Sequence, residues 1–248
     1  MRRLRFLVPP GALSAGAGAV VELPEEEARH LAVTLRAQPG FAVQLFDGAG
    51  AEWSGEVVEA RRASVRVRLA APETAPVESP LRVVVYQAVS VDRVFEESIE
   101  PLTALGAAAI APLITERART AGRAPDAKRL ARWRRIAAEA CKLSFRRVIP
   151  VIEEPLDVSA LAALPAAGAR VLLDPDAPPG SLRAVIEGPV PSEVGLAVGP
   201  EGGFTPEEVV LLTRAAFLPV CLGPRVLRTQ HAGPAALAIL MAAWSDLR

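Results

Sequence analysis

The residues best placed for chemistry lie in two loops near the C-terminal end of the chain. One loop, "GPEGGF", follows the apolar run at 196–198, and the other, "LGPRVLRTQHAG", follows "PVC". A strand, a glycine loop and a helix start in this order often bind phosphate, because free backbone N–H groups attract anions. Here Glu201, Glu207 and Glu208 carry the wrong charge, and neither the Walker lysine nor the G-x-G-x-x-G spacing is present. We expect a loop whose backbone approaches a neutral or cationic ligand, with a ligand-free turn as the alternative.

The second loop is unusually polar for a segment between two apolar runs. Burying Arg225, Arg228, Gln230 and His231 is costly unless these groups are paired, so they are either exposed or serve a ligand. We expect the final helix to begin near Pro234, because proline suits the first helical position. The chain shows no Ser/His/Asp order, no paired carboxylates and no metal-ligand cluster. Ordinary hydrolysis and a bound metal are therefore not expected.

The composition is typical of a folded chain without a membrane anchor. It is 51% apolar, which is ample for a core. Cys141 and Cys221 lie far apart in apolar or helical runs, so we expect small core residues. No apolar stretch reaches the roughly 18 residues of a membrane span, and the N-terminus has no long apolar region. We therefore expect a cytoplasmic protein that makes no membrane contact.

The elements that position these loops form two groups. Residues 1–69 read as several short strands with one helix, "PEEEARHLAVTLRA", on which Ala28 and Leu31 share a face. This pattern predicts a small barrel-like domain. A Pro-rich stretch without apolar periodicity follows. We expect a first domain at 1–70, a linker at 71–80 and a second domain at 81–248.

The second domain alternates strands and helices, which predicts a parallel sheet covered on both faces. One helix starts at Thr205, with Pro206 at its first position and Glu208 completing a capping box. Ligands bind beyond the carboxyl ends of such strands. Three strand ends carry unusual loops, and we expect them to meet in one pocket: "LLDPDAPPG", "GPEGGF" and "LGPRVLRTQHAG".

Charge is balanced overall but unevenly distributed. Residues 115–150 hold 11 Lys+Arg against 3 Asp+Glu, a net +8, whereas 151–248 hold 6 against 11, a net −5. A helix predicted at 126–145 buries Trp133 in its apolar stripe and leaves Arg132 and Arg135 on a cationic face. That face either contacts nucleic acid or is simply solvated.

Several motifs together resemble one family. "RFLV", "HLAVTLR", "FDGAG", "LGAAAIAPLITERA", "RWRRIAAEA", "GPEGGF" and "LGPRVLRT" occur in the order seen in the ribosomal RNA small-subunit methyltransferase E family of the SPOUT class. The resemblance covers nearly the whole chain. It implies an α/β fold with an N-terminal PUA-like β-barrel domain that binds RNA and a SPOUT parallel-sheet domain with a C-terminal trefoil knot. It also implies a homodimer that uses S-adenosylmethionine (SAM) to methylate N3 of a uridine in 16S ribosomal RNA of the small subunit.

The resemblance and the chemistry of single side chains together suggest roles for individual residues. Arg228 is expected to stabilise negative charge on the uracil, with Gln230 and His231 beside it in the catalytic group and His231 as a possible base. Arg5 and Arg36 are expected to contact the RNA backbone, with Arg132 and Arg135 as further contacts. The expected SAM pocket comprises Leu173, Asp174, Gly199, Pro200, Glu201, Gly202, Gly203, Leu222, Gly223, Arg225 and Leu227.

The chain departs from the family pattern at several positions. Where the family typically reads Arg-Thr-Glu-Thr-Ala, residues 228–232 read "RTQHA", which replaces a carboxylate by Gln230 and adds His231. Pro101 replaces a charged residue and should bend its helix. Two alternatives therefore stay open: a protein that binds RNA without catalysis, in which Gln230→Glu would rescue activity, and a SPOUT enzyme directed to another RNA site. Naked RNA and the assembled subunit both stay open as substrates.

Overall fold

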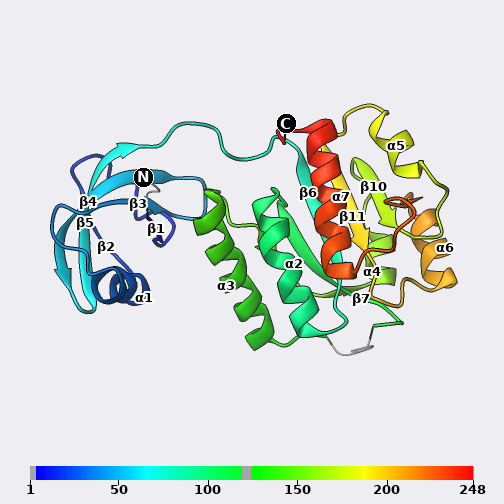
Figure 1. The fold of residues 1–248 in the computed structure, drawn as a ribbon, viewed down its shortest axis with the longest axis horizontal. Coiled ribbons are helices and arrows are strands. Elements are labelled where there is room, and N and C mark those ends of the chain that lie inside the picture. Colours follow the sequence, from blue (N-terminus) through cyan, green and yellow to red (C-terminus); the bar gives the residue numbers. More distant parts are fainter. Residues whose placement is uncertain (1–3, 119–123, 248) are drawn as a thin grey trace. The chain divides into compact units, whose positions relative to one another are not determined.

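The computed structural model describes residues 4–118 and 124–247, drawn as a ribbon in Figure 1. The chain forms two compact units. The first comprises Met1–Glu78 together with Cys141–Ile149, and the second comprises Ser79–Ala140 together with Pro150–Arg248. The change from the first unit to the second at Glu78 and Ser79 lies within the predicted linker.

The first unit contains a five-stranded sheet in the order β1-β3-β4-β5-β2. β1 pairs with β3 in parallel, and the other pairs are antiparallel. Side chains alternate as a half-buried sheet requires; on β5, Val65, Val67 and Leu69 are buried between exposed arginines. The order ends at β1 and β2, which do not pair within the described residues, so the expected closed barrel is not confirmed. The strands are β1 (Arg5–Leu7), β2 (Val20–Glu22), β3 (Ala42–Phe46), β4 (Glu52–Arg61) and β5 (Ser64–Pro72).

The predicted helix of the first unit is present but is not α-helical throughout. α1 spans Glu25–Arg29 and continues as a π-helical turn, η1, over His30–Thr34. Ala28 and Leu31 are fully buried, so the predicted apolar face is confirmed. Arg36 has a φ of 53°, a left-handed conformation that ends the helical path.

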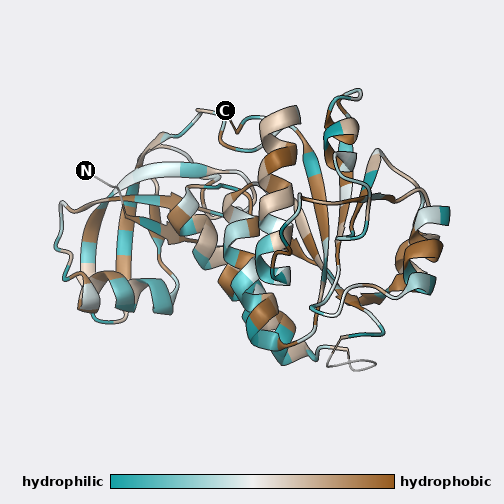
Figure 2. Ribbon diagram, turned by 45° about the vertical axis from the view of Figure 1, so that its right-hand side comes forward, coloured by the Kyte–Doolittle hydropathy of each residue, from teal (hydrophilic) through white to brown (hydrophobic). Residues whose placement is uncertain are grey.

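The second unit contains a parallel sheet, as predicted. Its order is β12-β10-β11-β6-β7-β8, with β9 pairing β7 off this path, and the pairs between these strands are parallel. Figure 2 shows brown, apolar residues along these strands between the covering helices. The strands are β6 (Arg82–Ala88), β7 (Ala109–Ile114), β8 (Val151–Ile152), β9 (Leu156–Asp157), β10 (Ala169–Leu173), β11 (Glu193–Val198) and β12 (Leu218–Val220).

Helices cover both faces of this sheet. Neighbouring residues of a strand point to opposite faces. Ala197 joins a core cluster with Leu212 of α6, whereas the methyl group of Val198 lies beside Gly233 of α7. α6 therefore covers one face and α7 the other, where α7 packs against α2 (Figure 1). The helices are α2 (Asp92–Ala104), α3 (Ala127–Ser144), α4 (Val158–Ala163), α5 (Ser181–Ile186), α6 (Pro206–Arg214) and α7 (Thr229–Trp244).

Two details of the predicted helices are confirmed, a buried core residue on α3 and the N-terminal cap of α6. On α3, Trp133 is fully buried, with its ring centroid 4.2 Å from that of Phe95, so its assignment to the core is confirmed. At the start of α6, the Thr205 hydroxyl accepts from the Glu208 amide and the Glu208 carboxylate accepts from the Thr205 amide. The predicted capping box is therefore confirmed.

The predicted start of the last helix is wrong. α7 begins at Thr229, five residues before Pro234, with Arg228 as its N-cap. Pro234 therefore lies inside the helix, where it cannot donate a backbone N–H to the carbonyl of Gln230. Thr229 and Gln230 instead gain burial and hydrogen bonds as helical residues, described below. Gln230 and His231 are accordingly part of a helix rather than of the preceding loop.

Candidate functional site

The loops after β10, β11 and β12 meet at the carboxyl edge of the second unit's sheet. A cavity of about 570 Å³ lies between residues 173–180 and the loop 220–227. An adjoining cavity of about 240 Å³ lies between residues 198–203 and 226–229. Both cavities are lined by Leu173, Pro175, Val226, Leu227 and Ala232. The prediction that the three loops form one pocket is therefore confirmed.

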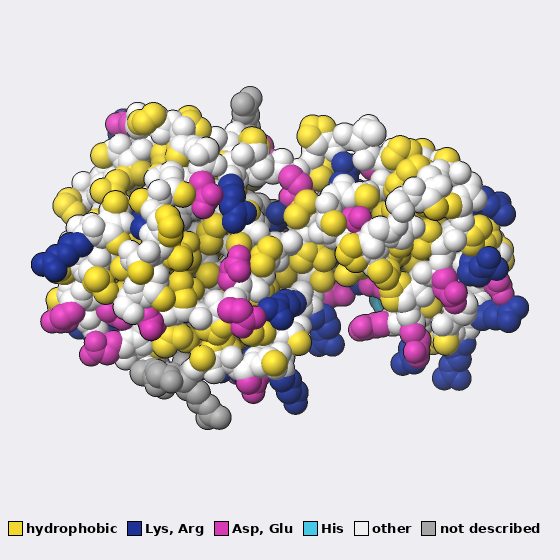
Figure 3. Space-filling view, turned by 180° about the vertical axis from the view of Figure 1, so that it is seen from behind, with side chains coloured by type: hydrophobic (Ala, Val, Ile, Leu, Met, Phe, Trp, Pro, Cys, Tyr) yellow, Lys and Arg dark blue, Asp and Glu magenta, His cyan; other side chains and the backbone are white. Residues whose placement is uncertain are grey.

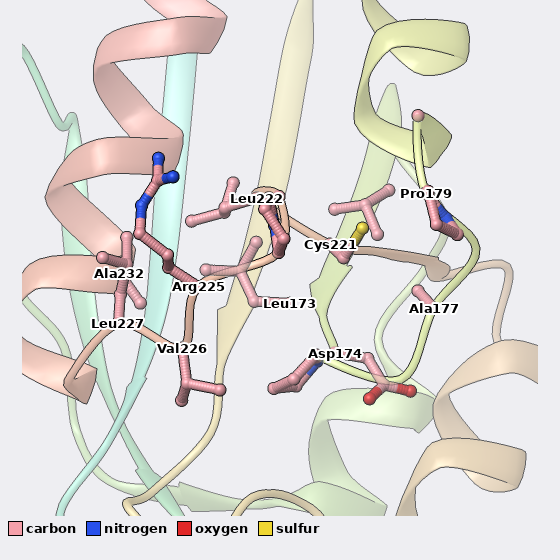
Figure 4. Close-up of a pocket in the computed structure, with 15 residues that line it drawn as sticks. Leu173, Asp174, Ala177, Pro179, Cys221, Leu222, Arg225, Val226, Leu227 and Ala232 are labelled. Carbon is pink, nitrogen blue, oxygen red and sulfur yellow. The ribbon is translucent and has the colours of Figure 1, made fainter.

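The walls of the larger cavity are mostly apolar, and Figure 4 shows how their side chains lie. Leu173 and Leu222 lie between the two charged residues, Asp174 and Arg225, whose side chains point apart. The Asp174 carboxylate accepts a hydrogen bond from the Asp176 amide at 3.0 Å. An apolar cavity with a few polar groups at its edge suits a small organic ligand with a flat apolar part.

The glycine loop is held in shape by contacts that only small residues allow. A Cβ on Gly199 would lie 3.0 Å from the ring of Phe204, closer than most real side chains pack. Gly203 has a φ of 70°, the left-handed region that favours glycine. From the β7 side, the Arg117 guanidinium donates to the carbonyls of Gly202 and Phe204 at 3.1 Å each. The backbone of the loop is thus fixed independently of any ligand.

The acidic residues of this loop do not all face the cavities. Glu201 lines the smaller cavity. Glu208 caps α6 with one carboxylate oxygen and accepts from the Glu116 amide at 2.9 Å with the other. Glu207 is exposed on the first turn of α6. Of these three glutamates, only Glu201 lines one of the two cavities.

Most residues of the expected SAM pocket line one of the two cavities. The exception is Gly202, which lines neither and meets Arg117 instead. Sequence reasoning missed several wall residues in or beside the loops it had singled out, including Cys221, which is buried as expected but also faces the larger cavity. The other missed wall residues are Pro175, Ala177, Pro179, Gly180, Val198, Val220, Thr229 and Ala232.

The three expected catalytic residues lie at the start of α7, Arg228 as its N-cap and the other two in its first turn, and do not face the same way. Arg228 is exposed and lines the smaller cavity. Gln230 is buried and donates from Nε2 to the carboxylate of Glu97 on α2 at 3.4 Å, and His231 is exposed. Neither Gln230 nor His231 lines either cavity. The pKa of Glu97 lies below its ordinary value, first because Arg93 donates a hydrogen bond to it and then through Gln230 and His231.

The expectation that Arg5 contacts RNA is wrong for this structure, because its side chain is only 1% exposed. Its guanidinium donates to Glu52 at 2.7 Å and to the carbonyls of Cys141 and Arg146 at 2.6 and 2.9 Å. Arg147 donates to the other oxygen of Glu52 at 2.8 Å. Arg5 therefore holds residues 141–149 within the first unit and has no donor directed at solvent.

The other expected RNA contacts are at the surface. Arg36 and Arg135 are exposed. Arg132 is 62% exposed but pairs with Glu96 of α2 at 2.8 Å, so α2 partly neutralises the cationic face of α3. On the face drawn in Figure 3, basic and acidic side chains are interspersed. A continuous basic surface is not seen on that face.

Residues 4–118 and 124–247 show neither a metal-ligand cluster nor a membrane-spanning helix. No group of three or more His, Cys, Asp or Glu is arranged to hold a metal ion there. Likewise, none of the helices in those ranges has the length and apolar character needed to span a membrane. Cys141 and Cys221 are free and buried, and burial raises the pKa of the Cys141 thiol to about 11.

Known proteins resemble this chain in both fold and sequence. Residues 77–241 match the RNA methyltransferase domain family, and residues 23–70 match the RNA methyltransferase PUA domain family. A solved structure from Legionella pneumophila in complex with the bound cofactor SAM has a TM-score of 0.89 and 34% identity, with 100% of both chains covered. A ribosomal RNA small subunit methyltransferase E from Neisseria gonorrhoeae bound to S-adenosyl methionine has a TM-score of 0.88 and 30% identity, again with 100% of both covered.

Relatives found by sequence comparison carry the same name as the solved structure from Neisseria gonorrhoeae. The ribosomal RNA small subunit methyltransferase E of Mycobacterium tuberculosis is 34% identical, over 92% of this chain and 89% of that protein. The protein of the same name from Synechocystis sp. is 33% identical, over 89% of this chain and 72% of that protein. The fold is therefore α/β, with a PUA domain and a SPOUT-like parallel-sheet methyltransferase domain. The chain belongs to the ribosomal RNA small subunit methyltransferase E family.

Proposed function

We propose that this protein transfers a methyl group from SAM to N3 of a uridine in 16S ribosomal RNA of the small subunit. The observation that carries the proposal is the pair of adjoining cavities at the carboxyl ends of β10, β11 and β12. Two relatives with the same fold, at 34% and 30% identity, were solved with SAM bound.

The residues around the cavities fit the chemistry of SAM. Its adenine is flat and largely apolar, and Leu173, Leu222 and Leu227 offer matching walls. Its sulfonium is cationic, and Asp174 and Glu201 supply negative charge at the edges of the two cavities. When bound, SAM supplies an electrophilic methyl group. The chain's part is to hold it by side chains and loop backbone, and to exclude water from the apolar walls.

Uridine N3 carries a proton at neutral pH, so the protein must help to remove it. Arg228 lines the smaller cavity and is exposed, and its guanidinium stabilises the negative charge that develops on the uracil oxygens. His231 follows in the first turn of α7 and is exposed, and we assign it as the base because imidazole is the side chain that most often acts as a general base in enzymes. Alignment of the uracil with the methyl donor then lowers the barrier further.

The remaining parts of the proposal concern architecture and RNA contact. The first domain, 1–70, is a PUA-like barrel that binds RNA, and residues 71–80 are a linker. The methyltransferase domain, 81–248 apart from residues 141–149 of the first unit, contains a trefoil knot and forms a homodimer. Arg36 and Arg135 are exposed and contact phosphates, with Arg132 contributing when it leaves Glu96. The protein works in the cytoplasm, where small subunits are assembled.

The experiment that tests this function has two steps. Titration calorimetry with SAM should detect binding to the purified protein, and labelled methyl groups should then enter unmodified small subunits or their naked RNA. Comparing the two RNAs identifies the substrate. Binding without transfer to either RNA would support the non-catalytic alternative. Absence of SAM binding would refute the enzymatic function altogether.

A further inference from the structure

A buried chain of hydrogen bonds connects β6, the first turn of α7 and the glycine loop. Gln87 lies near the end of β6 and is 1% exposed, and Thr229 is 4% exposed. The Gln87 amide nitrogen lies 3.0 Å from the Thr229 hydroxyl, which lies 2.6 Å from the carbonyl of Gly199. Three segments distant in sequence are therefore joined through one hydroxyl group.

The direction of these hydrogen bonds is fixed by chemistry. A carbonyl only accepts, so the single proton of the Thr229 hydroxyl goes to Gly199. The hydroxyl oxygen then accepts, and its partner must be the Nε2 group of Gln87. An acceptor at position 87 would compete with Gly199 for the same proton. A donor at position 87, unlike an acceptor, leaves the loop carbonyl satisfied.

The amide of Gln87 adopts this orientation at a cost. Its Oε1 atom is buried and has no hydrogen-bond partner among the described residues. A buried acceptor without a partner costs about 1–3 kcal/mol. A Cβ on Gly233 of α7 would lie 2.8 Å from the same oxygen, so the glycine leaves room for it. A polar side chain kept in so unfavourable a place indicates a function beyond packing.

We infer that Gln87 is a positioning residue for the glycine loop. By donating to Thr229, it directs the threonine hydroxyl to the Gly199 carbonyl and fixes the loop against the first turn of α7. Gly199 and Thr229 both line the smaller cavity, whereas Gln87 lines neither cavity. Gln87 therefore acts through Thr229, and its effect on SAM binding rests on the proposed function.

Three substitutions test this assignment. Thr229→Val removes the hydroxyl at similar size, and Thr229→Ser keeps it. Gln87→Glu keeps the size of the side chain, but its carboxylate is an acceptor and draws the Thr229 proton away from Gly199. We expect Thr229→Val and Gln87→Glu each to weaken SAM binding by about tenfold, from the usual cost of an unpaired buried group. Thr229→Ser should stay within about twofold of the unmodified chain, and the KM for RNA should not change.

A double variant tests whether the two side chains act as one unit. If they do, Gln87→Glu combined with Thr229→Val should be no weaker in SAM binding than Thr229→Val alone. Ser98→Ala is the matched control, because this buried hydroxyl bonds only within α2, to the Phe95 carbonyl at 2.6 Å. Ser98→Ala should leave SAM affinity unchanged. Additive losses from Gln87→Glu and Thr229→Val would overturn the inference.

A second measurement needs no ligand and separates this inference from the proposed function. Amide hydrogen exchange of residues 199–203 should be faster in Thr229→Val than in Thr229→Ser, because the loop loses its tether. Equal exchange in these two variants would overturn the inference whether or not the protein binds SAM. If the unmodified chain binds no SAM but Thr229→Val still speeds exchange, the proposed function fails and the positioning role stands.

Discussion

The side-chain amide of Gln230 and the carboxylate of Glu97 lie 3.4 Å apart, Nε2 against Oε2, and join α7 to α2. The amide can donate to this carboxylate, whereas a carboxylate at position 230 would face it with like charge. The departure from the family pattern at Gln230 therefore suits its neighbour on α2. Because Gln230 lines neither cavity, its amide does not alter the walls that SAM would touch.

Gln230→Glu is therefore expected to harm the protein rather than to raise its activity. Two adjacent carboxylates repel each other, which raises the pKa of one of them in the folded state. This repulsion destabilises the folded protein above the ordinary glutamate pKa and disappears below it, where one carboxyl group is protonated. The melting temperature should fall more at pH 8 than at pH 4. Glu97→Gln combined with Gln230→Glu reverses donor and acceptor and should recover the loss. A more active Gln230→Glu variant would contradict this account and favour the non-catalytic alternative.

Glu97 should make stability depend on pH. Its pKa is lowered in the folded protein, chiefly by the hydrogen bond from Arg93. A lowered carboxyl pKa stabilises the fold above the unfolded-state pKa, and this contribution is lost as pH falls through the folded value. Denaturant unfolding of the unmodified chain and of Glu97→Gln should therefore differ at pH 7 and converge well below pH 4.5, the ordinary glutamate pKa. A difference in unfolding free energy that persists at low pH would mean that Glu97 does not stabilise the fold through its charge.

Arg5→Met should destabilise the first unit without affecting RNA contact directly. The substitution leaves Glu52, 5% exposed, with Arg147 as its remaining cationic partner and frees two buried carbonyls. Breaking a buried ion pair costs about 3–5 kcal/mol. Urea unfolding should show a loss of that order. A fully stable Arg5→Met variant with weakened RNA binding would restore Arg5 as an RNA contact.

Arg135→Gln should weaken RNA binding and reduce its dependence on salt. Each phosphate contact contributes about one to the slope of log affinity against log salt, so one lost contact flattens that slope by about one. Filter binding at several salt concentrations measures it. Arg93→Gln is the control, because Arg93 is exposed on α2 and pairs with Glu97 at 2.8 Å. If the slope of log affinity against log salt is the same for Arg135→Gln and the unmodified chain, the cationic face of α3 is solvated and does not contact RNA.

Local signals were sufficient to predict much of the catalytic unit. Thr205, Pro206 and Glu208 act within one helical turn, so their cap could be read from the sequence and is confirmed. The apolar stripe around Trp133 likewise reports burial directly. The three loops were found because parallel strands bring their carboxyl ends to one edge. Many of the wall residues were named in advance, but the others were not, since side-chain direction within a loop leaves no periodic signal.

Long-range partners explain what the sequence could not reveal. Arg5 lies in a motif near the start of the chain, and its partners Cys141 and Arg146 are more than 130 residues away. Nothing local marks it as buried. Pro234 suggested a helix start, but Thr229 and Gln230 are stabilised by Gln87 and Glu97, so α7 begins earlier. In each case tertiary hydrogen bonds override the local preference.

The most direct test of the central claim is mass spectrometry of nucleosides from 16S ribosomal RNA after incubation of unmodified small subunits with the protein and SAM. The account predicts 3-methyluridine, absent without protein and strongly reduced with Arg228→Ala. A methyl group on another base, or on another atom of uridine, would contradict the assigned specificity. No methylated nucleoside from either subunits or naked RNA would contradict the catalytic function itself.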